Sequence, residues 1–323
     1  MKNPGGPEQL IFGEVPTPRP GPSQLLVRNH AFSLNYVDIL QRKGKYPVPP
    51  HASDLLGMDI AGVVEETGAH VTRFKKGDRV MCLLDGGAYA EYSLAEEVLT
   101  MPIPENLSFE EAAVIPQVFL TAYQALFLIG EIQPLQWVLI HSGAGGVGSA
   151  AIQLCKEAGA RPIATCGSLD KVEACISLGA TAALNYRSGP FAPKVLELTD
   201  GHGVDLILDF IGASYWEQNF HVLAKGGAIV QLATLGGAQI PSFDLSKLMS
   251  KWATITGSTL RKRPLQYKAR LVKEFSEFAL SRFERRTLRP VATKILPWKE
   301  VQKAHQLLES ASVIGKIVLS IHN

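Results

Sequence analysis

The stretch that decides the fold spans Trp137 to Leu154 and reads WVLIHSGAGGVGSAAIQL. A short apolar β-branched run leads into glycines and then into apolar residues at helical spacing, which predicts a strand, a tight turn and a helix. Within the turn, Gly143, Gly145 and Gly148 satisfy the spacing G-x-G-x-x-G. Residues without side chains let backbone amides and a helix N-terminus approach a pyrophosphate, so the spacing favours a dinucleotide site. A tight turn without a ligand is the alternative.

The composition indicates a globular chain whose main partner is a small molecule. With 323 residues, of which 46% are hydrophobic, the chain is long enough for two domains. Lys and Arg number 32 against 30 Asp and Glu, and this balance argues against nucleic acid or an anionic membrane surface as the main partner. We expect no signal segment and no membrane span, because no apolar run approaches ~18 residues.

The cysteines indicate a reducing compartment. None of them forms a C-x-x-C pair, so we expect neither a zinc site nor a disulfide framework, and we expect a cytoplasmic protein. The four are Cys82, Cys155, Cys166 and Cys175.

Two patterns meet near Ser108. Before it, short strand-like segments between Gly, Pro and Asp predict a mostly β region, with a short helix over 32–42. Ser108 and Glu111 have the spacing of a capping box. Beyond them strands and helices alternate, which predicts an α/β fold with a doubly wound, six-stranded parallel sheet. We expect its strands at 138–140, 163–166, 182–186, 204–209, 228–232 and 253–257, and in the tail helices to 283 and 310 with strands at 291–296 and 315–320.

The end of the second strand of this sheet bears on the choice of cofactor. NAD-specific folds of this type place an acidic residue there, on the ribose 2′-hydroxyl. Here the strand ends in Gly167 and Ser168, with Lys171 close by, and these residues suit a 2′-phosphate. The sequence therefore predicts NADPH. Asp170 argues against a bound 2′-phosphate, although a carboxylate is ordinary in a first helical turn. The alternative for Lys171 is a place on a solvated helix face without a ligand.

Motifs spread over nearly the whole chain share one family resemblance. They are Phe32 to Tyr46, Gly57-Met-Asp-Ile-Ala-Gly, Lys76-Gly-Asp-Arg-Val, Gly87-Ala-Tyr-Ala-Glu-Tyr, the glycine turn, Asn185-Tyr186 and Leu208-Asp-Phe-Ile-Gly. Together they resemble the zinc-independent quinone oxidoreductases of the medium-chain dehydrogenase/reductase superfamily. Pro4-Gly-Gly-Pro-Glu, Leu34-Asn-Tyr-Val-Asp and Ser214-Tyr-Trp-Glu are most similar to the tumour-suppressor-inducible NADPH quinone oxidoreductase branch.

The resemblance implies a domain layout and a metal-free site. A GroES-like catalytic domain is expected over 1–116, a Rossmann domain over 117–260, and a C-terminal segment, 261–323, that returns to the catalytic domain. Where zinc-dependent relatives have a ligand Cys and a Gly-His-Glu motif, this chain has Asn35 and Gly57-Met58-Asp59. These residues cannot hold zinc as those sites do.

The resemblance also implies the site residues. Asn35 and Tyr46 occupy active-site positions, and Tyr46 either donates a hydrogen bond or proton or acts as an aromatic lid among prolines. Thr121 would lie near the nicotinamide, or else bond to its own helix backbone. Lys171 and Tyr186 would flank the 2′-phosphate, with Arg261 or Arg263 as a third cation unless these form a solvated turn. The residues expected to bind cofactor are Thr121, Gly143, Ala144, Gly145, Gly146, Val147, Gly148, Gly167, Ser168, Lys171 and Tyr186.

The predicted function is NADPH-dependent reduction of quinones or similar α,β-unsaturated carbonyls. The alternatives are a 2-enoyl thioester reductase, since that group has a Gly-x-Tyr like Gly44-Lys45-Tyr46, and a nucleotide-binding structural or RNA-binding protein with little catalysis. Residues 252–257 read as the outermost strand of the sheet, and its unpaired edge predicts a homodimer. A tail that folds over this edge would leave a monomer.

Overall fold

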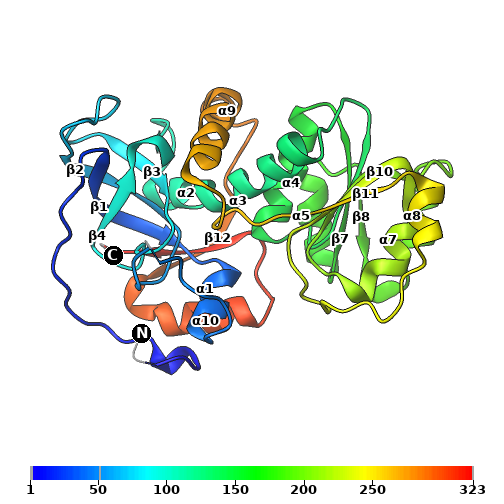
Figure 1. Cartoon of the computed structure of the whole chain (residues 1–323), viewed down its shortest axis with the longest axis horizontal. Coiled ribbons are helices and arrows are strands. Elements are labelled where there is room, and N and C mark those ends of the chain that lie inside the picture. Colours follow the sequence, from blue (N-terminus) through cyan, green and yellow to red (C-terminus); the bar gives the residue numbers. More distant parts are fainter. Residues whose placement is uncertain (1–2, 51, 322–323) are drawn as a thin grey trace. The chain divides into compact units, whose positions relative to one another are not determined.

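The computed structural model describes residues 3–50 and 52–321, which form two compact units. The first unit contains the residues up to Leu120 together with those from Arg261 onward, and the second spans Thr121–Leu260 (Figure 1). The expected division between residues 116 and 117 and the division between the units both lie in helix α3 (Ile115–Tyr123). The chain leaves the first unit and later returns to it, whereas the catalytic or cofactor role of each unit stays a prediction.

A mostly antiparallel sheet is the frame of the first unit. Its strands follow the order β12-β13-β1-β2-β3-β5, and β4 pairs with β1 outside this path. Because β13 pairs with β1, the last strand of the described residues lies beside the first. The strands are β1 (Gln24–Ser33), β2 (Asp59–Thr67), β3 (Arg79–Leu83), β4 (Tyr92–Glu96), β5 (Thr100–Pro102), β12 (Ala292–Pro297) and β13 (Lys316–Ser320).

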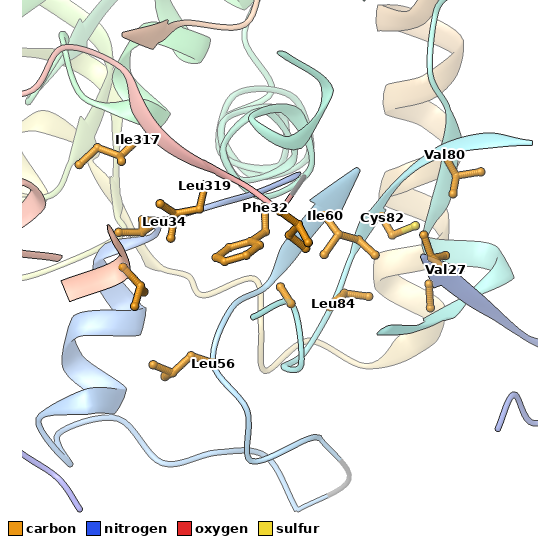
Figure 2. Packing of buried hydrophobic residues seen from close by; sticks show 14 of the residues in the cluster. Val27, Phe32, Leu34, Leu56, Ile60, Val80, Cys82, Leu84, Ile317 and Leu319 are labelled. Carbon is orange, nitrogen blue, oxygen red and sulfur yellow. The ribbon is translucent and has the colours of Figure 1, made fainter. Parts of the chain in front are cut away.

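The hydrophobic core of the first unit joins strands that are far apart in the sequence. Figure 2 shows Phe32 of β1, Ile60 of β2 and Leu319 of β13 gathered in one cluster. Each of these side chains is at most 1% exposed, and burial of each stabilises the fold by roughly 1.5 to 3 kcal/mol. The helices of this unit are α1 (Tyr36–Arg42), α2 (Phe109–Ala113), α9 (Leu265–Glu284) and α10 (Val301–Glu309).

The expected helix over 32–42 is wrong at its start. Phe32 and Ser33 belong to β1, and α1 begins only at Tyr36 after its N-cap residue, Asn35. Phe32 lies opposite Ile60 on one side and Leu319 on the other, so its backbone is part of two strand ladders. This pairing outweighs the helical spacing of the apolar residues. The capping box of Ser108 and Glu111, in contrast, is present at the start of α2.

The second unit is built on the predicted parallel sheet of six strands. Its order is β11-β10-β9-β6-β7-β8, so the direction of winding reverses between β6 and β9. Figure 1 shows α4 and α7 on opposite faces of this sheet, as a doubly wound fold requires. The strands are β6 (Trp137–Ile140), β7 (Arg161–Cys166), β8 (Ala182–Asn185), β9 (Val204–Asp209), β10 (Leu223–Gln231) and β11 (Thr254–Gly257). The helices are α4 (Gly146–Glu157), α5 (Leu169–Ser177), α6 (Ala192–Leu198), α7 (Trp216–Val222) and α8 (Leu245–Lys251).

Within the described ranges, no helix combines the length and the apolar character that crossing a membrane requires.

Candidate active site

The glycine turn between β6 and α4 is shaped by contacts that exclude side chains. The amide of Gly143 donates to the carbonyl oxygen of Thr165 at 2.9 Å and so fixes the turn against β7. A Cβ on Gly143 would lie 2.6 Å from the Cβ of Ala164, and a Cβ on Gly148 would lie 2.3 Å from the carbonyl oxygen of Ser142. Both distances are too short for any side chain, so the local packing requires glycine at these two positions.

The turn ends at the N-terminus of a helix. Gly145 is the N-cap of α4, and the amides of Gly146, Val147 and Gly148 in its first turn have no acceptor within the helix. Ala144 is buried in the turn. Because the sheet reverses its winding beside β6, this helix N-terminus lies where open α/β sheets bind ligands. The arrangement suits an anionic group such as a pyrophosphate.

At the end of β7, the structure brings together Gly167 and Tyr186. A Cβ on Gly167 would lie 2.6 Å from the hydroxyl oxygen of Tyr186, so the absence of a side chain makes room for this phenol. Ser168 is the N-cap residue of α5, and Lys171 is half-buried in the first turn of that helix. These positions form a polar, glycine-containing edge next to β8, with no acid at the end of β7.

Asp170 contributes a negative charge to the same first turn of α5. The hydroxyl of Ser168 donates a hydrogen bond to its carboxylate and lowers its pKa, so the exposed Asp170 stays ionised at neutral pH. A 2′-phosphate beside Ser168 would compete with this hydrogen bond. Asp170 therefore opposes the predicted preference for NADPH, and Lys171 favours it.

Thr121 has a buried hydroxyl oxygen with no hydrogen-bond partner among the described residues. The alternative in which this hydroxyl bonds to its own helix backbone is therefore wrong. Gln117, one turn earlier in α3, likewise has a buried side-chain oxygen that lacks a partner in the described part of the chain. The next turn, Gln124–Ile129, is π-helical, a distortion frequent at functional sites. A buried polar atom without a partner is rare, and a ligand would satisfy it.

Asn35 lies in a buried polar cluster of the first unit. Its side-chain oxygen accepts a hydrogen bond from Nζ of Lys316 at 2.5 Å, and its Nδ2 donates to Oδ1 of Asp59 at 3.2 Å. Burial raises the pKa of Asp59, and the Lys316 ammonium, whose Nζ lies 3.8 Å from Oδ2, opposes that rise. Burial lowers the pKa of Lys316, and the nearby carboxyl groups of Asp59 and Asp38 oppose this decrease. Two charges of opposite sign thus contact the two ends of one amide.

A second carboxyl group lies on the backbone side of Asn35. The amide of Asn35 donates to Oδ2 of Asp38 at 2.8 Å, and the Tyr89 hydroxyl donates to the same oxygen at 3.2 Å. Burial raises the pKa of Asp38 to about 7, an effect that the bond from Asn35 reduces. Nε2 of His305 lies 3.1 Å from the Tyr89 hydroxyl, and Nη1 of Arg42 lies 3.2 Å from Nδ1 of His305. An arginine only donates, so His305 accepts at Nδ1 and donates from Nε2.

Tyr46 is half-buried beside two cations. The guanidinium carbon of Arg261 lies 5.6 Å from the centre of its ring, and Nζ of Lys262 lies 5.5 Å from it. Burial raises the pKa of Tyr46, Asp85 adds to the rise and Arg261 opposes it, so the phenol is neutral at pH 7. Arg261 itself is buried and donates to the Asp85 carbonyl and to Oε1 of Gln41. A solvated turn is therefore the wrong interpretation of Arg261.

A cavity of about 1190 Å³ opens next to this group within the first unit. Its lining includes Arg261, Lys262 and the prolines that directly follow Tyr46, namely Pro47, Pro49 and Pro50. The volume is sufficient for a small organic ligand. In the first unit, apolar proline side chains, two cationic side chains and the neutral phenol of Tyr46 thus lie close together.

Comparison with known proteins agrees with both units. The family model described as alcohol dehydrogenase GroES-like domain matches residues 21–105, and the one described as zinc-binding dehydrogenase matches residues 146–277. The quinone oxidoreductase of Rattus norvegicus is 30% identical over 321 residues, which cover 98% of this chain and 94% of that protein. The chain belongs to the quinone oxidoreductases. The family resemblance predicted from the sequence is thereby confirmed, whereas the narrower branch stays a prediction.

Solved structures of similar proteins differ in the cofactor that they name. The Escherichia coli quinone oxidoreductase complexed with NADPH is 31% identical, with a TM-score of 0.88 and coverage of 98% of this chain and 97% of that one. An NAD-dependent alcohol dehydrogenase is 34% identical, with a TM-score of 0.87 and the same coverage of the two chains. Both similarities span the two units of this quinone oxidoreductase.

The expectation of a metal-free site concerns residues of the first unit, outside the range 146–277 that the zinc-binding dehydrogenase model matches. The family resemblance implies that Asn35 and Met58 replace two zinc ligands of zinc-dependent relatives, and neither offers the thiolate or imidazole that zinc prefers. Across residues 3–50 and 52–321, no three His, Cys, Asp or Glu residues come together as a set of metal ligands.

Sequence reasoning missed the polar residues that surround Asn35. Lys316 lies 281 positions from Asn35 and reaches it only because β13 pairs with β1. Asp38 lies three positions after Asn35 and could have been found, since an acidic residue there reaches back to the N-cap amide of a helix. The family resemblance relates Asp59 only to the Gly-His-Glu motif of zinc-dependent relatives and does not predict its contact with Asn35.

Proposed function

We propose that the chain catalyses metal-free, NADPH-dependent hydride transfer to quinones or related α,β-unsaturated carbonyls. The observation that carries the proposal is the glycine turn, which presents the amides of a helix N-terminus at the reversal point of a parallel sheet. It occurs in a chain that is 31% identical to a quinone oxidoreductase complexed with NADPH. Asn35 and Met58 in place of zinc ligands support a mechanism without metal.

The second unit supplies the cofactor site. The pyrophosphate is proposed to lie on the turn formed by Gly143, Ala144, Gly145, Gly146, Val147 and Gly148. The 2′-phosphate is proposed to lie among Gly167, Ser168, Lys171 and Tyr186, and the unpartnered hydroxyl of Thr121 supports a place near the nicotinamide. When bound, NADPH supplies a hydride.

The first unit supplies the acceptor side. Tyr46 is neutral at pH 7, so its hydroxyl can donate a hydrogen bond or a proton to an acceptor oxygen on which negative charge develops. Asn35 offers an amide donor that is already oriented by its neighbours. A quinone needs little further help, because the hydroquinone anion is delocalised, whereas an enone oxygen depends more on such donors.

A panel of acceptors tests the proposal. The purified chain is mixed with NADPH and, in separate reactions, with a naphthoquinone, a small enone and an enoyl-CoA, and the loss of NADPH absorbance is followed. We expect turnover of the quinone, and slower turnover of the enone. Rapid turnover of enoyl-CoA with only a trace of quinone reduction would identify a 2-enoyl thioester reductase instead. Tight NADPH binding without turnover of any acceptor would favour the nucleotide-binding structural role.

We propose further that the chain forms a homodimer through the edge strand β11. β11 pairs only with β10 among the described strands, so its other edge is unpaired. The preceding helix, α8, presents apolar side chains to solvent, with Met249 73% exposed and Trp252, its C-cap residue, 70% exposed. Exposed apolar residues next to an unpaired edge favour association with a second copy. The described tail belongs to the first compact unit and forms no strand beside β11.

The cytoplasm is the compartment that we propose. All four cysteines, Cys82, Cys155, Cys166 and Cys175, are buried free thiols. Unpaired thiols are typical of a reducing compartment. Localisation of a tagged full-length chain by fluorescence microscopy tests this, and accumulation in an oxidising compartment would contradict it.

A further inference from the structure

The carboxamide of Asn35 is fixed at both ends by buried charges. Lys316 donates to its oxygen and Asp59 accepts from its nitrogen, while Nζ of Lys316 lies 3.8 Å from Oδ2 of Asp59. Asp59 is fully buried, Lys316 is 4% exposed and Asn35 is 7% exposed. The three side chains come from β2, from β13 and from the N-cap of α1, so the triangle depends on three separate elements.

The signs of the charges select one orientation of the amide. A flip of the carboxamide would turn its NH₂ group toward the Lys316 ammonium and its oxygen toward the Asp59 carboxylate. Both contacts would be repulsive at low local dielectric. Asp59 is itself fixed, because Oδ1 also accepts from the Ser33 hydroxyl at 2.8 Å. The observed orientation is therefore strongly favoured over its alternative.

This orientation leaves one N–H of Asn35 available. An amide nitrogen carries two hydrogens, and Asp59 accepts one of them. No residue in the described part of the chain accepts the second. A donor whose direction is set before the substrate binds costs no reorganisation during the reaction.

We propose that Lys316 and Asp59 are positioning residues, which direct the second amide hydrogen of Asn35 toward the acceptor oxygen as negative charge develops on it. This inference rests on the proposed function, in which Asn35 faces the acceptor. A buried ion pair is weak evidence of a gain in stability, since desolvation offsets much of its attraction. Fixing the direction of Asn35 accounts for a lysine and an aspartate buried at this place.

A double-mutant cycle on kcat tests the proposal. Quinone reduction is measured for the wild type, Lys316→Met, Asn35→Ala and the double variant. Methionine keeps the length of the side chain and removes its charge. We expect Lys316→Met to lower kcat about tenfold with little change in the Kd of NADPH, because a misdirected donor loses part of the 10²- to 10³-fold that such donors contribute. In the Asn35→Ala background, the same substitution should have no further effect.

Three results would overturn the proposal. If Lys316→Met lowers kcat by the same factor with and without the Asn35 side chain, the lysine does not act through Asn35. Full kcat in Asn35→Ala would remove the role of Asn35, and with it this inference, while the wild-type activity and the rest of the proposed function would stand. A loss confined to KM or to NADPH affinity would place Lys316 in binding rather than in positioning.

Two further variants keep the test decisive. Lys268→Met removes another buried lysine of the first unit, which pairs with Asp85 at 2.6 Å and contacts neither Asn35 nor Asp59. Its effect on kcat should be the same with and without Asn35. If Lys316→Met does not fold, as judged by its thermal unfolding, Asp59→Asn replaces it in the cycle, because this change keeps the shape and removes the charge. Lys316→Arg, which keeps the charge, should retain more activity than Lys316→Met.

Discussion

Lys171 brings a positive charge to the first turn of α5, which also contains Asp170. If its ammonium binds the 2′-phosphate, Lys171→Ala should weaken NADPH binding more than NADH binding. The expected difference is about 1.5 to 3 kcal/mol, the range of a charge-assisted hydrogen bond, or roughly 10- to 150-fold in the ratio of the Kd values. Fluorescence titration with both cofactors measures it. Lys194→Ala, on the exposed face of α6, is the matched control and should change neither Kd. Equal weakening of both cofactors would refute the assignment.

Tyr46 should matter more for weak acceptors than for quinones. Tyr46→Phe is expected to lower kcat for an enone more than for a quinone, because the enone oxygen needs the donor more. Since burial raises the pKa of this phenol above its usual value near 10, the donor stays protonated at neutral and mildly alkaline pH. Enone turnover by the wild type should therefore fall only as the pH rises beyond that range. Full enone activity in the Phe variant would mean that Tyr46 does not act as a donor and would favour its role as an aromatic lid.

Asp38 gives the first unit a pH dependence of stability. Burial raises its pKa to about 7 from an ordinary value of 3.8, so the folded state binds the proton more tightly than the unfolded state does. The stabilisation is complete below pH 3.8 and is lost as the pH rises through about 7, at roughly 1.4 kcal/mol for each pH unit in between.

Asp38→Asn should remove this dependence. The wild type loses this stabilisation between pH 5 and pH 8 and the variant does not, so the Tm of the variant minus the Tm of the wild type should be larger at pH 8 than at pH 5. Thermal unfolding at the two pH values measures the change, with the exposed Asp200→Asn as the control. If the difference in Tm between the wild type and the Asp38 variant is the same at both pH values, the pKa of Asp38 is not raised.

At the scale of elements, the packing of α4 against its own turn leaves no space for a side chain at Gly148. Gly148→Ala would place a Cβ 2.3 Å from the carbonyl oxygen of Ser142 and 2.7 Å from Cα of Gly143, both of which are backbone atoms. The helix must then move, so we expect a loss of about 1 to 3 kcal/mol in the free energy of unfolding and weaker NADPH binding. A Cβ on Gly257 in β11 would have no neighbouring atom within 4 Å, so Gly257→Ala should lower the free energy of unfolding far less. Urea unfolding measures the free energy of unfolding of both variants, and equal values for the two would contradict strain at Gly148.

Local signals predicted the second unit well and the first unit less well. The strand, glycine turn and helix from Trp137 onward are recognisable within a few residues, and β6, β7 and β9 are short, largely apolar runs followed by a helix. The first unit depends on pairing between distant segments. Nothing in the sequence around Phe32 shows that Leu319 will lie beside it and continue β1 past the expected helix start.

The same distinction separates the parts of the candidate site. The glycine turn and the acid-free end of β7 follow from local patterns. Asn35 and Tyr46 were predicted from a family resemblance, and their roles stay predictions. The ammonium beside Asn35 could not be predicted, because Lys316 comes from a strand whose register with β1 is set by packing across the sheet.

At the scale of the whole molecule, association through β11 is open to a direct test. Light scattering or sedimentation at micromolar concentration should give twice the 35.0 kDa of one chain. Ile255→Lys puts a charge on the unpaired edge and should yield monomers, whereas Leu135→Lys, at an exposed apolar residue in the loop before β6, should leave the dimer intact. A wild type with the mass of one chain would reject the pairing of edges.

The place of β13 has a consequence for the order in which the molecule takes shape on the ribosome. Residues 121–260 are contiguous, so their parallel sheet can form as soon as that stretch has emerged from the exit tunnel. β1 emerges long before, yet one side of it has no neighbour over residues 31–33 until residues 318–320 have been synthesised. The unit whose first residues are made before the second unit is therefore completed after it, and Asn35 gains its lysine only once residue 316 has been synthesised.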